Sequence, residues 1–179
     1  MFNFFRKKSE GPQVTDAVFI STAAKYQVML DEWEKNKSII YIFWFEGSLN
    51  EASSYFSTAT TEEIVLLLAR ETTFHQLSGK ISVFAEHYPL ETKEQDFYQK
   101  MNLKLVKVYS ALNEPLYKHF GAEKIVDIMR KLGMKEDEAI EHSMISSSIK
   151  KAQKKIEKNV LIEKTAHSQS DWLQKNYKP

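Results

Sequence analysis

Short apolar runs and helix-spaced apolar residues alternate along the first two thirds of the chain. Five segments have the length and composition of strands: residues 17–21, 39–45, 64–69, 81–85 and 103–110. Residues 22–35 and 91–101 carry apolar side chains at helical spacing, and Thr22 can cap the first of these helices. Strands that alternate with helices in this way predict an α/β fold, with a mostly parallel sheet of about five strands between helices.

Differences among the strands predict their places in the sheet. Residues 39–45 are continuously apolar, which is typical of a strand buried on both faces. Residues 103–110 alternate apolar residues with lysines, which favours a position nearer the sheet edge. Gly47 and Ser48 are expected to end the second strand, and residues 49–56 to form one or two helical turns.

The pattern changes after residue 110. A short helix is predicted to begin at Asn113 and to close at Gly121, because Pro115 is tolerated in a first helical turn. An amphipathic helix is predicted over residues 122–132, with Gly133 as its C-terminal cap.

No glycine or proline interrupts residues 144–177, which therefore predict a single long helix. Four apolar residues form a stripe along its first half: Ile145, Ile149, Ala152 and Ile156. Such a helix lies along a surface or a partner. The chain then divides into a flexible tail (1–14), an α/β domain (15–134) and a helical extension (135–179).

Composition narrows the class of protein. A chain of 179 residues with a net charge of +1 is unlike a nucleic-acid binder that works by bulk charge, so no nucleic-acid partner is expected. Zero cysteines exclude disulfides and thiolate metal sites within this sequence. No apolar run approaches the roughly 18 residues of a membrane span. We expect a cytoplasmic protein, with peripheral contact at the inner face of the membrane as the alternative.

Polar residues that follow two of the predicted strands are candidate ligand-facing residues: Arg70, Glu71, Glu86 and His87. Open α/β sheets bind ligands at the carboxyl ends of their strands, and a carboxylate–imidazole pair can serve in acid–base chemistry. Ordinary loop and surface positions are the alternative. The histidines lack the spacing of metal ligands, so we expect no metal, cofactor or catalytic residue.

The predicted long helix carries candidate partner-binding residues: Lys150, Lys151, Lys154, Lys155, Lys158 and Trp172. A helix with that excess of lysine can contact an acidic partner or anionic lipid, whereas a solvated helix face is the simpler interpretation. Trp172 has little sequence after it to bury it, so it can anchor a partner or pack back on the domain.

Four consecutive segments indicate a relative: SALNEPLYKHFG at 110–121, IVDIMRKLGM at 125–134, EHSMIS at 141–146 and SIKKAQKKIE at 148–157. Together, residues 109–158 resemble the exit from the second nucleotide-binding domain of SecA, the ATPase that drives preprotein translocation. The resemblance covers about fifty residues across four elements and implies a RecA-like α/β fold. Residues 15–108 resemble that family only in layout, and the match lapses after Glu157.

The motifs with which the family binds nucleotide are missing here. The sequence contains no Gly-x-x-x-x-Gly-Lys-Thr P-loop. Residues 69–75 lack the glycines of the family's loop after the third strand, and residues 88–98 carry acids where the family has arginines that neutralise a transferring phosphoryl group. The resemblance therefore implies a degenerate domain that keeps the fold but lacks the residues with which the family catalyses phosphoryl transfer.

These observations predict a non-catalytic, SecA-like protein-interaction module linked to preprotein translocation, with the translocation machinery as the partner. One alternative is a small-substrate enzyme that uses the strand-end residues named above. The other is a domain that self-associates through its C-terminal helix.

Overall fold

Five parallel strands form a single sheet in the computed structural model, which describes residues 11–122, 135 and 137–178. The strands are β1 (Gln13–Phe19), β2 (Ile39–Phe43), β3 (Leu66–Leu68), β4 (Ile81–Phe84) and β5 (Leu105–Ala111), in the spatial order β1-β5-β4-β2-β3. Every neighbouring pair is parallel. The predicted α/β fold is confirmed, and this sheet is consistent with a RecA-like domain.

The position predicted for β5 is wrong, because β5 lies between β1 and β4 and the edges are β1 and β3. The alternating lysines suggested an edge, but an interior strand can carry a lysine whose charged end reaches the sheet margin. Lys107 does so: its ammonium lies 3.6 Å from Glu32 and 4.6 Å from the ring centre of Tyr109.

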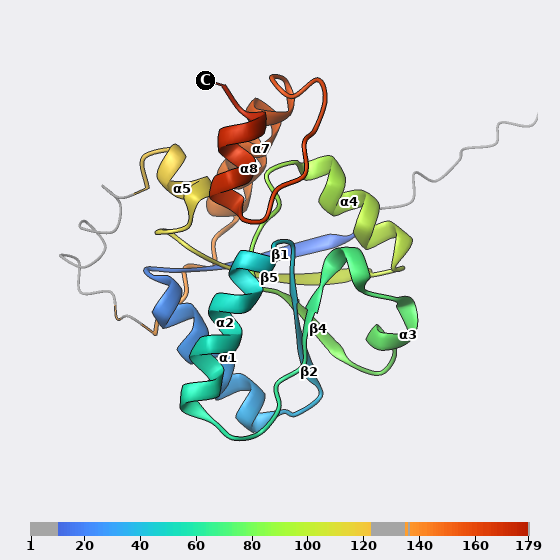
Figure 1. Cartoon of the computed structure of the whole chain (residues 1–179), viewed down its shortest axis with the longest axis vertical. Coiled ribbons are helices and arrows are strands. Elements are labelled where there is room, and N and C mark those ends of the chain that lie inside the picture. The colour runs from blue at the N-terminus through green and yellow to red at the C-terminus, as the bar shows by residue number, and fades with distance from the viewer. Residues whose placement is uncertain (1–10, 123–134, 136, 179) are drawn as a thin grey trace, which may run out of the picture.

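Helices cover both faces of the sheet (Figure 1). The helices α1 (Thr22–Lys35) and α2 (Glu46–Ala59) pack on one face, and α3 (Phe74–Leu77) and α4 (Glu91–Lys100) on the other, where a short 3-10 turn, Ala69–Glu71, follows β3. The first face buries the aromatic residues of α1, and the second buries Tyr98 and Met101 against β4 and β5.

Two helix starts differ from the sequence prediction. Ser21, not Thr22, caps α1, because its hydroxyl accepts a hydrogen bond from the amide of Ala24. The predicted break at Gly47 lies inside α2, which begins at Glu46 and runs for 14 residues rather than one or two turns. A glycine in a first turn does not stop a helix whose later residues Ala52 and Phe56 are buried.

The predicted single long helix is wrong, because the chain forms two helices there. These are α7 (Ser143–Glu157) and α8 (Gln169–Asn176), joined by residues 158–168. The side-chain amide of Asn159 donates to the carbonyl of Lys155 and so satisfies the end of α7. Ser168 caps α8 by accepting from the amide of Asp171. Both are local signals that a search for glycine and proline overlooks.

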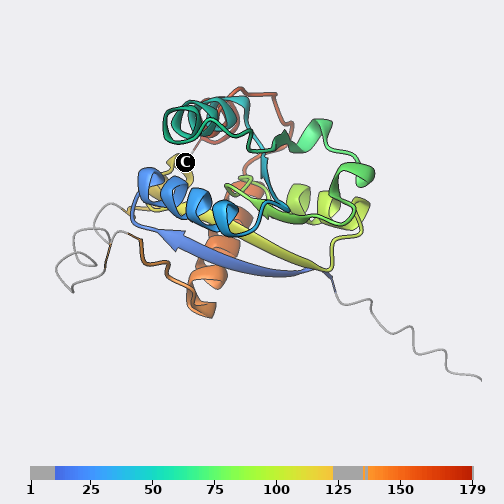
Figure 2. The same cartoon turned by 90° about the horizontal axis from the view of Figure 1, so that it is seen from below.

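The C-terminal helices pack onto the α/β domain at the carboxyl edge of the sheet (Figure 1). Alongside them lies α5 (Pro115–His119). Figure 2 shows α1 and α7 on opposite sides of β1, and Ile140 forms an antiparallel bridge with Val18 of that strand. Because β1 begins at Gln13, the first strand includes the last two residues of the predicted tail. The helix predicted over 122–132, with its cap Gly133, falls almost wholly outside the described residues.

The cap of α8 supports a first prediction. Replacing Ser168 with alanine should lower the free energy of unfolding by about 1 kcal/mol, since the amide of Asp171 loses its acceptor. Urea unfolding followed by circular dichroism measures this loss. Ser170→Ala, at an exposed position two residues further along, is the matched control and should change stability by less than about 0.5 kcal/mol.

Candidate functional site

The loops that follow the strands place several buried ionisable side chains at the carboxyl edge of the sheet. This is the edge at which open α/β sheets bind ligands. The buried charged and polar residues there come from β1, α1, α4, α5, α7, α8 and the turn after β4: Asp16, Lys25, Glu86, His87, Glu94, Glu114, Gln153 and Gln169. They form two neighbouring networks, one around His87 and one around Glu86.

His87 lies between two carboxylates. Its Nε2 is 2.9 Å from Oδ1 of Asp16, and its Nδ1 is 2.9 Å from Oε1 of Glu94. The side chains of all three residues are at most 4% exposed. Both ring nitrogens can donate only when the imidazole is protonated, so the geometry fits a buried imidazolium with two counter-ions.

The carboxylates of Asp16 and Glu94 favour the protonated, charged form of His87. Burial alone would lower the pKa of His87, but the charges of Glu94 and Asp16 and their hydrogen bonds outweigh it and raise the pKa to about 10. Burial would likewise raise the pKa of Asp16, yet the hydrogen bond and charge of His87 hold that pKa below its usual value. His87 and Asp16 are therefore both charged at neutral pH.

Glu86 follows β4, and its carboxylate reaches the N-terminal end of α2. One of its oxygens accepts hydrogen bonds of 3.0 Å from the amides of Trp44 and Phe45, and the other accepts a 2.7 Å bond from the hydroxyl of Ser48. Phe45 is the N-terminal cap residue of α2, so Glu86 satisfies the amide of the cap residue and the amide just before it. Burial raises the pKa of Glu86 to about 7, against the lowering effect of the Ser48 hydrogen bond.

Lys25 and Glu114 form a second buried pair beside Glu86. The Lys25 ammonium lies 2.5 Å from Oε1 of Glu114 and 2.6 Å from the carbonyl oxygen of Ala85. Burial raises the pKa of Glu114, although the charge of Lys25 opposes this. At the start of α1, the side-chain oxygen of Asn113 accepts from both the amide and the hydroxyl of Thr22.

A polar pocket of about 370 Å³ lies beside these groups, between the N-terminal ends of α1, α2 and α8. Lys25, Glu86 and Glu114 contribute to its wall, together with Glu51 and Ser170. The arrangement offers carboxyl and hydroxyl groups to a small polar molecule, and Glu86, with a pKa near neutrality, can exchange a proton there.

The C-terminal helices cover the rest of this edge. Gln169 of α8 donates to the carbonyl of His87 and accepts from the amide of Leu116. Gln153 of α7 donates to the carbonyl of Tyr88 and to Glu94. The chain thus fills with its own side chains much of the crevice that could otherwise admit a ligand.

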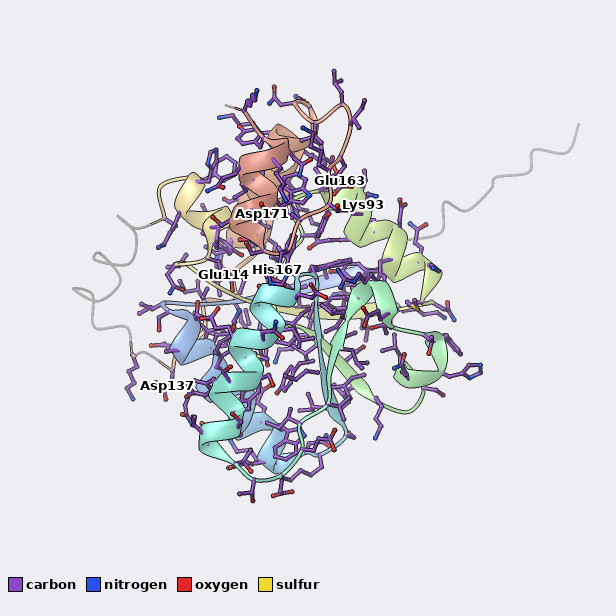
Figure 3. All side chains as sticks on the ribbon, in the orientation of Figure 1. Lys93, Glu114, Asp137, Glu163, His167 and Asp171 are labelled. Carbon is purple, nitrogen blue, oxygen red and sulfur yellow. The ribbon has the colours of Figure 1, made fainter. Side chains whose placement is uncertain are left out.

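The four residues predicted to face a ligand do not come together. Arg70 and Glu71 are exposed, and Arg70 pairs with Glu71 and with Glu46, which also contacts His167 of the loop before α8. Figure 3 shows His167 at the end of α2 that approaches α8. Glu86 and His87 are instead buried, at 2% and 3% exposure. Only Glu86 reaches the pocket.

Sequence reasoning missed the partners of His87 and Glu86. Asp16 stands directly before the apolar residues of β1, and Lys25 occupies a buried position among the apolar residues of α1. An ionisable side chain on an otherwise apolar face is the signal that could have found both, because such groups are seldom fully buried unless paired. Nothing in the spacing of Glu94 and Glu114 identified them.

The predicted partner-binding residues also separate into two sets. Trp172 is fully buried and its indole nitrogen donates to Glu163, so it is not available as a surface anchor; it packs back on the domain. The five lysines of α7 and its C-terminal end are exposed. Among them, Lys154 lies 3.5 Å from Glu91, and Lys155 lies 5.8 Å from the ring centre of Phe120.

Two further findings concern the described residues only. They contain no group of three or more histidine, aspartate or glutamate side chains arranged to hold a metal ion. Among them, no helix has the length and apolar character needed to span a membrane.

Comparison with known proteins finds relatives among SecA translocase subunits. The chain is 51% identical over 53 residues to the protein translocase subunit SecA of Ehrlichia canis (strain Jake), and 49% identical over 51 residues to protein translocase subunit SecA 1 of Alkaliphilus metalliredigens. SecA of Acidithiobacillus ferrooxidans is 47% identical over 51 residues. No family profile matches the chain.

Each match covers 28–30% of this chain but only 6% of the relative. The chain therefore spans a small fraction of the length of these translocase subunits. The extent of the match is close to the fifty residues on which the resemblance was based. The chain therefore carries a SecA-like region of about fifty residues, and its parallel sheet is consistent with a RecA-like domain.

Proposed function

We propose that this chain is a non-catalytic, SecA-like domain that binds a protein partner in preprotein translocation. The observation that supports it best is the position of the Glu86 carboxylate. It accepts from the amides of Trp44 and Phe45 at the start of α2, where a helix N-terminus would otherwise offer donors to a phosphate.

A phosphate at this edge would meet several carboxylates. The start of α1 is similarly occupied, because Asn113 accepts from the amide of Thr22. Glu114 and Glu51 contribute further carboxylates to the pocket. Together with the missing P-loop and the missing arginines, these contacts favour a domain that keeps the fold without nucleotide chemistry.

The covered edge also favours a role in binding rather than catalysis. A ligand as large as a nucleotide could lie along this edge only if α8 moved away, because Gln169 and Trp172 occupy it. Moving α8 would expose Trp172, Leu173 and Tyr177, which are all buried. The exposed lysines of α7 offer instead a surface for an acidic protein, in the cytoplasm or at the inner face of the membrane.

Nucleotide binding tests the non-catalytic part of the proposal. We expect ATP and ADP, with and without Mg²⁺, to leave the midpoint of thermal unfolding unchanged, since a ligand present at one hundred times its Kd would add about 2.7 kcal/mol. Full-length SecA is the positive control. A rise of several degrees with either nucleotide would contradict the proposal.

Pull-down from native lysate with the immobilised chain tests the partner. We expect components of the translocation machinery to be recovered, and recovery to fall when Lys150, Lys151 and Lys154 are replaced with glutamate. Replacing Lys35, Lys80 and Lys100 with glutamate is the matched control, because it changes the same charge at exposed positions elsewhere. Equal recovery with both variants would exclude the lysine face of α7 as the binding surface.

One observation favours a second candidate, a small-substrate enzyme. Glu86, whose pKa is raised to about 7, lines a polar pocket and can act as an acid or a base near neutral pH. A fragment screen by nuclear magnetic resonance tests it. Ligands that shift the amide signals around Ser48 and Asn113, and whose binding is lost in Glu86→Gln, would favour the enzyme.

A further inference from the structure

The loop that joins α7 to α8 carries the two most exposed large aliphatic side chains in the described part of the chain. Leu161 is 96% exposed and Ile162 is 84% exposed. Two adjacent aliphatic residues held fully in water are unfavourable, since burying each contributes about 1.5 to 3 kcal/mol. Figure 1 shows this loop standing clear of the sheet, at the same end of the molecule as the C-terminus.

The loop is fixed on both sides of this pair. Before it, Val160 packs against the cluster around Trp172. After it, Glu163 accepts from Tyr88 and from the indole of Trp172, and Lys164 exchanges two hydrogen bonds with the side chain of Asn176. The exposure of Leu161 and Ile162 is therefore imposed by the fold around them, and a freely moving loop does not explain it.

Positive charge surrounds the exposed pair. Lys158 and Lys164 flank it, and neither has an acidic partner within the described ranges 11–122, 135 and 137–178. The two nearby acids are directed toward the domain instead. Glu163 pairs with Lys93, as Figure 3 shows, and Glu157 accepts from the amide and hydroxyl of Thr92. The outward surface of the loop is thus aliphatic at its tip and cationic behind it.

This combination fits a lipid bilayer better than a protein. A specific protein interface buries roughly 800 Å² on each side and centres on aromatic or arginine anchors in pockets. Two protruding aliphatic residues supply neither the area nor the anchors. A bilayer accepts a convex aliphatic tip at the boundary of its acyl chains, while lysines behind the tip attract anionic headgroups.

We propose that Leu161 and Ile162 insert into the surface of an anionic lipid bilayer, with Lys158 and Lys164 at the level of the headgroup phosphates. The contact would hold the domain at a membrane without a spanning segment. It does not depend on the function proposed above, because it uses neither the carboxyl edge of the sheet nor Lys150, Lys151 and Lys154 of α7.

Sedimentation with protein-free vesicles tests the contact. We expect the whole chain to bind vesicles of phosphatidylglycerol and phosphatidylcholine in equal parts, and to bind pure phosphatidylcholine at least about tenfold more weakly. The double variant Leu161→Ser, Ile162→Ser should weaken binding at least about tenfold. Lys158→Gln and Lys164→Gln should each weaken it about fivefold, and added salt should weaken it further.

Leu105→Ser is the matched control, because Leu105 is 75% exposed and begins β5 at the opposite edge of the sheet. It should leave vesicle binding unchanged. Since the sequence has no cysteine, Leu161→Cys labelled with an environment-sensitive dye reports insertion at a single place. Its emission should shift to the blue with anionic vesicles, whereas the dye on Leu105→Cys should not shift.

Three outcomes would overturn the proposal: no binding to anionic vesicles, equal binding by the Leu161→Ser, Ile162→Ser variant, or no blue shift at position 161. Binding to cell membranes whose proteins are intact distinguishes a lipid contact from a protein contact. If the chain binds those membranes but neither protease-treated membranes nor protein-free vesicles, the tip contacts a protein and the lipid proposal is wrong.

Discussion

Replacing Trp172 with alanine is expected to lower the free energy of unfolding by about 3 to 5 kcal/mol, since the side chain is fully buried and its removal leaves a large cavity. Its ring packs edge-on against Tyr88, with centroids 5.9 Å apart, and its indole nitrogen donates to Glu163. Urea unfolding followed by circular dichroism measures the loss.

Leu161→Ala is the matched control for this prediction. It removes an aliphatic side chain from the neighbouring loop, but at a position that is 96% exposed, so stability should change by less than about 0.5 kcal/mol. Trp172→Ala should also speed proteolysis within residues 158–168, because α8 loses its main contact with the domain. Wild-type stability in Trp172→Ala would mean that α8 is not docked in solution. The proposal that the carboxyl edge is covered would then fail.

Replacing His87 with glutamine should be as damaging. The variant leaves Asp16 and Glu94 buried without the positive charge between them, and breaking a buried ion pair in this way costs about 3 to 5 kcal/mol. His75→Gln, at an exposed position on α3, makes the same chemical change without burial and should be nearly neutral. Equal stability of the two variants would show that His87 is not charged in the folded protein.

The same network predicts a pH dependence. The pKa of His87 is about 10 in the folded protein and about 6.5 when unfolded, so its contribution is complete below pH 6.5 and is lost as the pH rises toward 10. In that window unfolding releases one proton, and stability should fall by about 1.4 kcal/mol for each pH unit. The lowered pKa of Asp16 acts at the other end, where its contribution is lost below about pH 3.8.

Unfolding of the wild type and of His87→Gln at pH 6.5, 8 and 9.5 isolates the contribution of His87. The difference between the two proteins should shrink as the pH rises. Glu114 and Lys150 lie near enough to influence the network, and both remain in the variant, so their effects cancel in the comparison. A difference that stays constant over this range would contradict a charged His87.

The sequence predicted the sheet because its signals are local. A run such as residues 39–43 is apolar at every position, and only a strand covered on both faces accommodates that run. The helices α1 and α4 followed in the same way from apolar spacing. The position of β5 in the sheet could not be predicted in this way, because the order of strands depends on contacts among distant segments. In addition, a lysine on a strand can reach solvent from an interior position.

The candidate site was predicted less well than the fold. Glu86 and His87 were identified from their position after a strand, but their burial depends on partners that lie far away in the chain. The hydrogen bond between His87 and Asp16 joins residues 71 positions apart, and that between Glu86 and Trp44 joins residues 42 positions apart. No pattern of neighbouring residues encodes such pairs.

By itself, the sequence determined the α/β class, the five strands and the stretch that resembles SecA, because each of these depends on residue types at short spacing. Only the tertiary structure decided that the C-terminal segment breaks into α7 and α8, that Trp172 is buried, and that Leu161 and Ile162 are exposed. The physical reason is burial. A side chain is buried or exposed according to which distant segments pack against it, and the packing of α8 on the carboxyl edge of the sheet buries Trp172 while it leaves the loop before α8 in solvent.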